Sequence, residues 1–269
     1  KMELKIFSHG KKESGSRKMP SQFSEGYRPG LIKRAVHALQ SAARQDYGAD
    51  PRAGMRHSSK LSKRRRKYRG CYGFGISRVN RKILSRRGTR FFWVGAFSPQ
   101  TVGGRRSHAP KAEKDREKKI NKKENRKAIR SAMAATINNS LVSERGHKVP
   151  ENYPFILSKD FENLSKTKEV IGMLTGLGFG DELVRSEKKK VRSGIGKTRG
   201  RKYQRKKGVL LVVSQDCALL KSAKNVAGVD VAIVNSLNCS LLAPGAMPGR
   251  LTLWTESALE KLENEKLYS

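Results

Sequence analysis

The chain has 269 residues, with 59 Lys and Arg against 23 Asp and Glu, and its formal net charge of +36 at pH 7 is far too basic for an ordinary solution enzyme. Hydrophobic residues make up 36% of the chain, below the roughly 45–50% of an average globular domain, so one part is expected to fold around a core while another part need not. The sequence has neither an apolar run of about 18 residues nor the apolar region of a secretory signal, so no membrane span is expected and the cytoplasm is the predicted location.

Two regular elements are predicted ahead of the most basic part of the chain. Residues 2–7 alternate apolar and polar side chains, with Met2, Leu4 and Ile6 on one side, as a half-buried strand does. A helix is expected from about Pro29, because proline suits the first helical turn and apolar residues recur at spacings of three and four after it.

The positive charge is concentrated in two windows that contain no acidic residue. Residues 51–112 hold 18 Lys and Arg, residues 188–208 hold 11, and together they carry 29 of the 59 basic residues. Like charges without an internal counter-charge resist compaction, so the neutralising partner is expected to be an external polyanion. The alternative for any such charge run is a solvated tail.

Aromatic residues argue against a solvated tail in the first window. Seven of the 18 aromatic residues lie between positions 68 and 97, interleaved with Arg, Lys and Gly, whereas solvated tails are poor in aromatics. Basic groups neutralise phosphates and aromatic rings stack on unpaired bases, so this composition predicts a segment that threads RNA. RNA is favoured over DNA because no helix-turn-helix, zinc finger or zipper is readable. A buried aromatic core remains the alternative.

Beyond the first window, the pattern is that of an α/β protein with a largely parallel sheet, because strand-like and helix-like stretches alternate. The stretch VLLVVS is continuously apolar, as a strand covered on both faces would be. Ser257 and Glu260 match a capping box and are expected to open the last helix. The predicted helices are 125–142, 166–177 and 217–226, and the predicted strands are 154–158, 182–186, 209–214, 229–235 and 250–254.

A nucleotide-dependent enzyme is the natural rival for such a fold, but its motifs are incomplete. The stretch VRSGIGKT, residues 191–198, lacks the first glycine of a phosphate loop and follows three lysines instead of an apolar strand. The glycines of 70–75 have the wrong spacing for a dinucleotide loop. Neither the three cysteines nor the five histidines show metal-ligand spacing, and no nucleophile elbow is present, so no catalytic or metal site is predicted.

Several motifs in order along the chain resemble those of one family. They are YRPGLIKRAVHALQSAARQDYGADPRAGMR at 27–56, PQTVGGRRSHAPKAEKDRE at 99–117, RKAIRSAMAAT at 126–136, VRSGIGKTRGRKY at 191–203 and LAPGAMPGRLTLWTESAL at 242–259. On these motifs the chain resembles, over nearly its whole length, the archaeal form of the family of the fourth large-subunit ribosomal protein.

The resemblance implies a single three-layer α/β/α domain, residues 1–269, interrupted by a long, basic, irregular internal loop at about 48–112. It implies that this loop penetrates large-subunit ribosomal RNA as far as the wall of the peptide exit tunnel, with its tip between about Tyr68 and Gln100. The implied partners are this RNA, neighbouring large-subunit proteins and the nascent polypeptide, with a role in early assembly and no membrane. No cofactor is implied beyond structural Mg²⁺ ions that the RNA would bind.

The residues predicted to contact RNA are basic side chains of the two windows, with a histidine in a matching motif. They are Arg52, Arg56, Lys63, Arg64, Arg65, Arg66, Lys67, Arg69, Arg78, Arg81, Lys82, Arg86, Arg87, Arg90, Arg105, Arg106, His108, Lys111, Lys197, Arg199, Arg201 and Lys202. The candidates for base stacking or for the tunnel tip are Tyr68, Tyr72, Phe74, Phe91, Phe92, Trp93 and Phe97.

Two other functions stay open from the sequence. One is an RNA-modifying or RNA-processing enzyme that uses the α/β sheet for a cofactor, and a nucleotide or S-adenosylmethionine bound to the native protein would favour it. The other is a free regulator that binds RNA only transiently, which stoichiometric presence in ribosomes would distinguish from a structural role.

Overall fold

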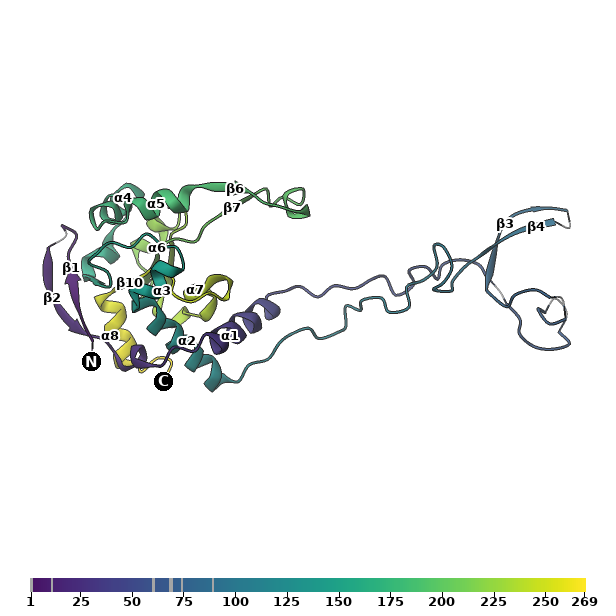
Figure 1. Ribbon diagram of the computed structural model, residues 1–269, viewed down its shortest axis with the longest axis horizontal. Coiled ribbons are helices and arrows are strands. Elements are labelled where there is room, and N and C mark those ends of the chain that lie inside the picture. The colour runs from purple at the N-terminus through teal and green to yellow at the C-terminus, as the bar shows by residue number, and fades with distance from the viewer. Residues whose placement is uncertain (1, 11, 60, 68–69, 74, 89) are drawn as a thin grey trace. The chain divides into compact units, whose positions relative to one another are not determined.

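The computed structural model describes residues 2–10, 12–59, 61–67, 70–73, 75–88 and 90–269 (Figure 1). The chain divides into two compact units. The first, called the body below, comprises the residues up to Ala43 and Glu117–Ser269, and the second, called the insert, comprises Arg44–Arg116. The acid-free window 51–112 and the segment 48–112 of the family resemblance both lie within the insert.

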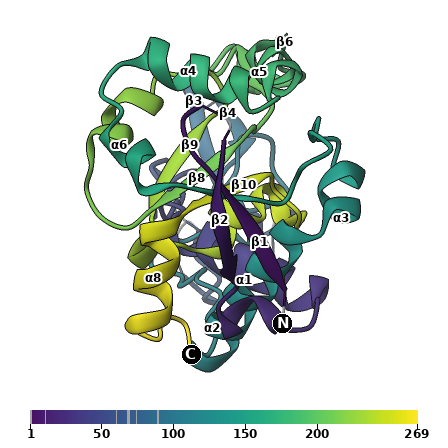
Figure 2. The same ribbon diagram turned by 90° about the vertical axis from the view of Figure 1, so that its left-hand side faces the viewer.

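A six-stranded sheet lies at the centre of the body, and all its neighbouring strands are parallel except β2 and β1. This confirms the predicted α/β class with a mostly parallel sheet. The antiparallel pair β2 and β1 faces the viewer in Figure 2. In spatial order the strands are β2 (Glu13–Lys18), β1 (Glu3–Phe7), β5 (Ile156–Leu157), β10 (Thr252–Thr255), β8 (Leu210–Val213) and β9 (Asp230–Ile233).

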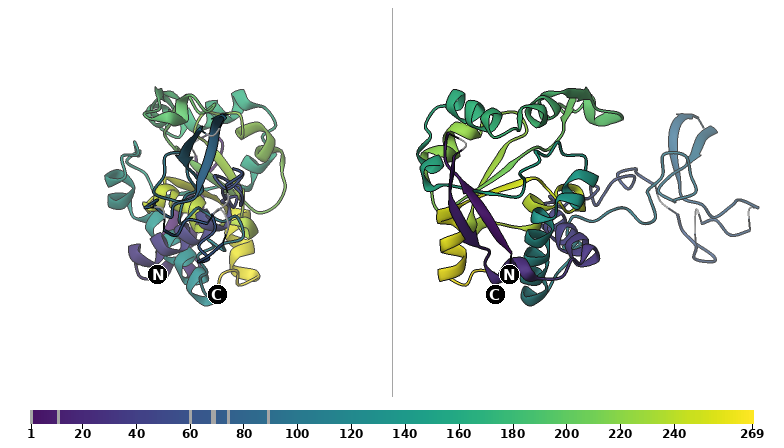
Figure 3. Two further views of the ribbon diagram at one scale, coloured as in Figure 1. Left: turned by 90° about the vertical axis from the view of Figure 1, so that its right-hand side faces the viewer. Right: turned by 60° about the vertical axis from the view of Figure 1, so that its left-hand side comes forward.

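Both faces of the sheet carry an apolar cluster, because successive side chains of a strand point to opposite faces. Leu210 and Val212 of β8 belong to one cluster and Leu211 and Val213 to the other, and all four are fully buried. Each such side chain contributes about 1.5–3 kcal/mol by leaving water. Helices α1 (Pro29–Ala42), α2 (Lys122–Ile137), α7 (Cys239–Leu242) and α8 (Glu256–Asn264) pack in the first cluster, and α4 (Thr167–Gly176) and α6 (Ala218–Ala223) pack in the second. Figure 3 shows the strands between these helices.

The predicted elements at 2–7, 154–158, 166–177, 209–214, 217–226, 229–235 and 250–254, and the helix from Pro29, are confirmed with shifts of a few residues. Short 3₁₀ turns complete the body at Ser21–Ser24, Lys159–Asn163, Ile195–Lys197, Val234–Ser236 and Pro244–Ala246. No helix in the described part of the chain is both long and apolar enough to cross a membrane.

The strand predicted at 182–186 is wrong, because these residues lie in helix α5 (Gly180–Glu187). The face that this helix buries carries Glu182 and Ser186, which are four residues apart and polar, so the apolar spacing that normally reveals a helix is missing. Two acidic residues in its first turn favour the helix by their interaction with its dipole.

The single helix predicted over 125–142 is two helices, α2 and α3 (Asn139–Glu144). The break is Asn138, whose backbone is extended at φ −78° and ψ 105°. Its side-chain oxygen accepts a hydrogen bond from the backbone N–H of Ser140 at 3.1 Å and so caps the second helix.

The predicted cap of the last helix at Ser257 is also wrong, because α8 begins earlier and its N-cap is Thr255. The Thr255 hydroxyl accepts from the backbone N–H of Ala258 at 3.2 Å and donates to the buried carboxylate of Glu162 at 2.6 Å. The carboxylate also accepts from Ser214 through both its backbone N–H and its hydroxyl. Thr255 therefore joins α8 to the carboxyl end of the sheet.

Substituting Thr255→Val is expected to lower the free energy of unfolding by about 2 kcal/mol, because it removes a helix cap and a hydrogen bond to a buried charged group. Urea unfolding followed by circular dichroism measures the change. Ser257→Ala is the control and should stay within about 0.5 kcal/mol. Equal effects of the two substitutions would contradict the capping role of Thr255.

Candidate RNA-binding surface

The two ends of the insert are held together by main-chain contacts and by one arginine. The backbone N–H of Ala49 donates to the carbonyl of Pro110 at 2.8 Å. The Arg116 guanidinium donates to the carbonyls of Tyr47 at 2.8 Å and Lys111 at 2.9 Å, and its carbon lies 4.2 Å from the Tyr47 ring centroid. Arg116 therefore joins the two chain segments at the base of the insert, which are called the stem below.

Glycines allow the two segments of the stem to approach each other more closely than a residue with a side chain would permit. A Cβ at Gly48 would overlap the backbone nitrogen of Ala112. Gly54 has φ +72°, and a Cβ there would lie 2.6 Å from Arg105 Cα. The close pairing of the stem therefore depends on glycine at both positions.

A tight turn presents the arginine pair of the GGRRSH motif. The Ser98 carbonyl accepts from both the backbone N–H of Thr101 at 3.2 Å and its hydroxyl at 2.7 Å. Arg105 follows this turn, and its guanidinium carbon lies 5.9 Å from the ring centroid of Phe97. Arg105 is half-buried and held against a ring, whereas Arg106 is exposed.

Part of the first window is a regular hairpin, so the prediction of an irregular loop is wrong for this part. Strand β3 (Arg81–Arg87) pairs antiparallel with β4 (Arg90–Gly95), and the register shifts between Ile83 and Ser85. Four large apolar side chains of the hairpin are about half exposed or more: Ile83 at 53%, Leu84 at 63%, Phe92 at 51% and Trp93 at 49%. Exposed aromatics between arginines make a surface on which bases can stack.

Tyr72 lies in a second aromatic and basic cluster of the insert. Arg78 donates to the Tyr72 hydroxyl at 3.0 Å and lies 5.2 Å from its ring centroid, and Arg65 lies 5.7 Å from the same ring. The two guanidinium groups add positive charge beside an exposed ring, so phosphate and base contacts can form at one place.

The second basic window also contains a hairpin, although no regular element was predicted there from the sequence. Strand β6 (Lys189–Val191) pairs antiparallel with β7 (Tyr203–Arg205), and this hairpin is labelled in Figure 1. The ammonium groups of Lys189 and Lys202 lie 4.9 and 5.5 Å from the Tyr203 ring centroid. The stretch 191–198 begins at the last residue of β6 and otherwise contains only a 3₁₀ turn. No α-helix follows β6 in this stretch, so it differs from a nucleotide phosphate loop, which leads from a strand into a helix.

A buried charge cluster holds the base of this second hairpin. The fully buried Glu182 accepts from Arg185 at 2.6 and 2.7 Å, from His147 Nδ1 at 2.7 Å and from the backbone N–H of Lys148 at 2.9 Å. Burial raises the pKa of Glu182, but these hydrogen bonds outweigh burial and hold the pKa at about 2. Arg185 also donates to the carbonyl of Lys207 at 2.8 Å, which links helix α5 to the end of the hairpin.

Most of the predicted contact residues are exposed, and few of them are neutralised within the chain. Among the described basic residues of 51–112, leaving Arg86 aside, Arg56 alone forms an ion pair, with Asp50. Exposed are Arg52, Arg56, Lys63, Arg64, Arg65, Arg66, Lys67, Arg78, Arg86, Arg87, Arg90, Arg106, His108, Lys111, Lys197, Arg199, Arg201, Lys202, Tyr72, Phe92 and Trp93. Half-buried are Arg81, Lys82, Arg105 and Phe97; Phe91 lies in β4; and Arg69, Tyr68 and Phe74 lie outside the described residues.

Three kinds of residue on the candidate surface were not predicted from the sequence. Tyr203 follows the same pattern as the first window, an aromatic among lysines and arginines, and that signal was available. The exposed Ile83 and Leu84 were missed because apolar residues are expected to be buried. Tyr47 and Arg116 lie far apart in sequence, and nothing in the residue pattern indicates their contact.

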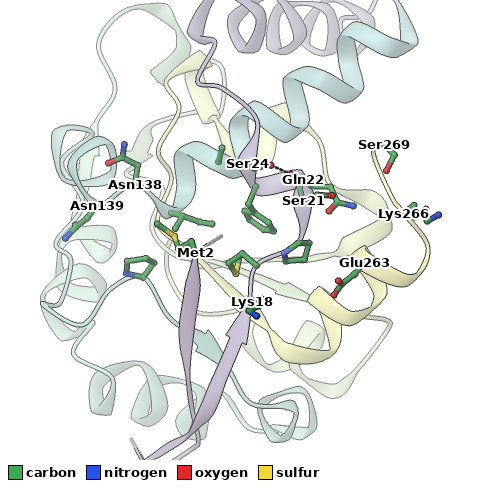
Figure 4. A pocket seen from close by; sticks show the side chains of 16 residues that line it. Met2, Lys18, Ser21, Gln22, Ser24, Asn138, Asn139, Glu263, Lys266 and Ser269 are labelled. Atoms are coloured by element: carbon green, nitrogen blue, oxygen red, sulfur yellow. Dashed lines mark hydrogen bonds between the residues drawn. The ribbon is translucent and has the colours of Figure 1, made fainter.

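A cavity of about 1010 Å³ lies in the body. Figure 4 shows Asn138 and Asn139 on one side of it and Glu263, Lys266 and Ser269 on the other. Met, Phe, Pro, Ala and Ile side chains make up its apolar lining. No group of three or more His, Cys, Asp or Glu that could hold a metal ion occurs among the described residues.

Comparison with known proteins places these features in one family. Residues 18–265 match the family model described as "Ribosomal protein L4/L1 family". The chain is 47% identical to the large ribosomal subunit protein uL4 of Nanoarchaeum equitans over 99% of this chain and 100% of that protein. It is 44% identical to the protein of the same name from Methanococcus maripaludis, over 97% and 98%, and 45% identical to that from Archaeoglobus fulgidus, over 91% of each chain.

Proposed function

The chain belongs to the ribosomal protein L4/L1 family, a structural and non-enzymatic family, and from this premise we propose that it is a constituent of the large ribosomal subunit in the cytoplasm. We propose further that it binds large-subunit ribosomal RNA through the insert and through the β6–β7 hairpin. The observation that carries this proposal is the set of exposed cations in both segments. Most of these cations have no carboxylate partner among the described residues, and several lie beside aromatic rings.

The architecture of the proposal follows from the two units. The apolar clusters on both faces of the sheet support a three-layer α/β/α body. The insert would reach into folded RNA as far as the wall of the peptide exit tunnel, beside the nascent polypeptide and neighbouring ribosomal proteins, and would act early in assembly. Counterion release and base stacking would offset the entropy lost when the insert is ordered on RNA. Mg²⁺ ions near it would be those bound by the RNA.

Changing Arg105 and Arg106 together to Ala is expected to weaken binding to a transcript of large-subunit ribosomal RNA. The slope of log K against log salt concentration is negative, and each lost phosphate contact reduces its magnitude by about one. The double substitution should therefore reduce the magnitude by about two. Filter binding over a series of KCl concentrations measures it. The control changes the exposed Lys166 and Lys168 to Ala. An unchanged slope in the arginine variant would count against its phosphate contacts.

Sedimentation of native cell extract through a high-salt sucrose gradient tests the structural role. We expect one copy of the chain per large subunit to remain bound at high salt, because an insert threaded through folded RNA cannot leave without unfolding the RNA. Release into the soluble fraction would contradict the structural role and favour a transient regulator.

A further inference from the structure

One face of helix α1 is basic and lies outside both charged windows. Lys33, Arg34 and His37 follow Gly30 at spacings of three, four and seven residues, so they share one side of the helix. All three side chains are exposed. The opposite side packs into the apolar cluster of the body through residues such as Ile32, so the basic face points away from the core.

The chain that re-enters the body brings two more cations to this face. The backbone N–H of Lys118 donates to the hydroxyl of Ser41 at 2.8 Å, which fixes Lys118 and Lys119 beside the last turns of α1. Together these residues line a pocket of about 370 Å³. Its lining is Gly30, Lys33, Arg34, His37, Ala38, Lys118 and Lys119.

The charge in this pocket is poorly compensated. Lys33, Arg34, Lys118 and Lys119 are cationic at neutral pH. Of the lining residues, Arg34 alone forms an ion pair within the described part of the chain, with Glu124 at 3.2 Å. Four cations that line one pocket and have a single carboxylate partner among them repel one another, and a bound anion would reduce that repulsion.

The lining indicates which anion fits. Five of the seven lining residues have basic side chains, and no large aliphatic residue and no Phe, Tyr or Trp lines the pocket. Lysine ammonium groups and an arginine fork are the groups that bind phosphate oxygens. We propose that this pocket binds a phosphate group, and that a phosphodiester of the RNA backbone supplies it. The phosphate chemistry stands on the pocket alone, while its RNA source rests on the proposed function.

The test compares two charge-matched variants of the full chain. One carries Lys118→Gln and Lys119→Gln, and the other carries Lys166→Gln and Lys168→Gln, which remove the same charge from exposed positions on the body. Binding to a transcript of large-subunit ribosomal RNA is measured between 0.05 and 0.3 M KCl, a range of about sixfold in salt. The pocket variant is expected to reduce the magnitude of the negative slope of log K against log salt concentration by about one to two. The control is expected to leave the slope unchanged.

Inorganic phosphate, titrated by calorimetry at constant ionic strength without RNA, distinguishes the two sources of the group. If phosphate binding is lost in the pocket variant while its RNA slope is unchanged, the pocket serves a free anion and the RNA source is overturned. If neither measurement changes, the pocket binds no phosphate. The Arg105 and Arg106 variant, run in parallel, shows which proposal has failed. A normal slope in the pocket variant with a lowered slope in the arginine variant overturns this inference alone, and normal slopes in both overturn RNA binding itself.

Discussion

Replacing all five residues of Lys63–Lys67 by Gln is expected to weaken binding to large-subunit ribosomal RNA by about 10³- to 10⁴-fold at 0.1 M salt. The five side chains are exposed, consecutive and without a carboxylate partner among the described residues. Each phosphate contact releases about 0.7 to 0.9 of a counterion. The loss of five contacts should therefore also reduce the magnitude of the slope of log K against log salt concentration by about four. Filter binding over a salt series gives both quantities in one experiment.

Net charge alone could weaken binding, so the control removes the same charge elsewhere. Gln substitutions of five exposed lysines of the body serve this purpose: Lys12, Lys166, Lys168, Lys221 and Lys224. A local contact surface requires that the control keep a slope close to that of the parent chain. Similar losses in the two variants would show that the protein binds RNA through its overall charge and not through this segment.

The second large effect concerns the stability of the body. Glu182→Gln is expected to lower the free energy of unfolding by about 3–5 kcal/mol, because it leaves the guanidinium of Arg185 without its charged partner in a buried site. Urea unfolding at pH 7 measures this change. Glu187→Gln, on the exposed side of the same helix, is the control and should stay within about 0.5 kcal/mol.

The same carboxylate predicts a pH dependence. The pKa of Glu182 is about 2 in the folded chain and about 4.3 in an unfolded one, so the unfolded state binds more protons between these values. The stability that Glu182 provides is therefore complete above about pH 5 and is lost as the pH falls toward 2, a change of about 3 kcal/mol. The difference between the parent chain and Glu182→Gln should shrink over this window. A constant difference would contradict ionisation of Glu182 as the cause.

His147 adds to acid sensitivity at higher pH. Burial lowers its pKa, although its hydrogen bond to Glu182 opposes this effect. Because the folded pKa is lowered, the unfolded state gains a proton first as the pH falls through about 6.5. Destabilisation from His147 therefore begins before that from Glu182.

Local patterns were enough to predict the strands of the sheet other than β2. The edge strand β2 was not predicted, because its sequence ESGSRK has no large apolar side chain and so shows no alternation. The apolar run at 209–214 specified β8 without reference to the rest of the chain, since a strand buried on both faces must be apolar throughout. The segment 51–112 stands out in the sequence because it has no acidic residue.

The remaining features depend on contacts that only the folded chain makes. Helix α5 could not be predicted because its inward residue Glu182 is polar and finds its partners in other segments. The pocket on α1 needs Lys33 beside Lys118, and these residues are joined only through the fold. The β3–β4 hairpin was missed because its apolar residues face solvent and give no alternation between core and surface.

The hydrogen bond from Lys118 to Ser41 marks where the body's chain departs and returns. Because these two residues are in contact, the two parts of the body can pack together whatever the number of residues in the insert between them. The entropic cost of such a closure grows only with the logarithm of length, at about 0.6 kcal/mol for each doubling. Insertions and deletions between Ser41 and Lys118 can thus accumulate in evolution with little penalty to the core, and the reach of the insert can change independently of the fold that carries it.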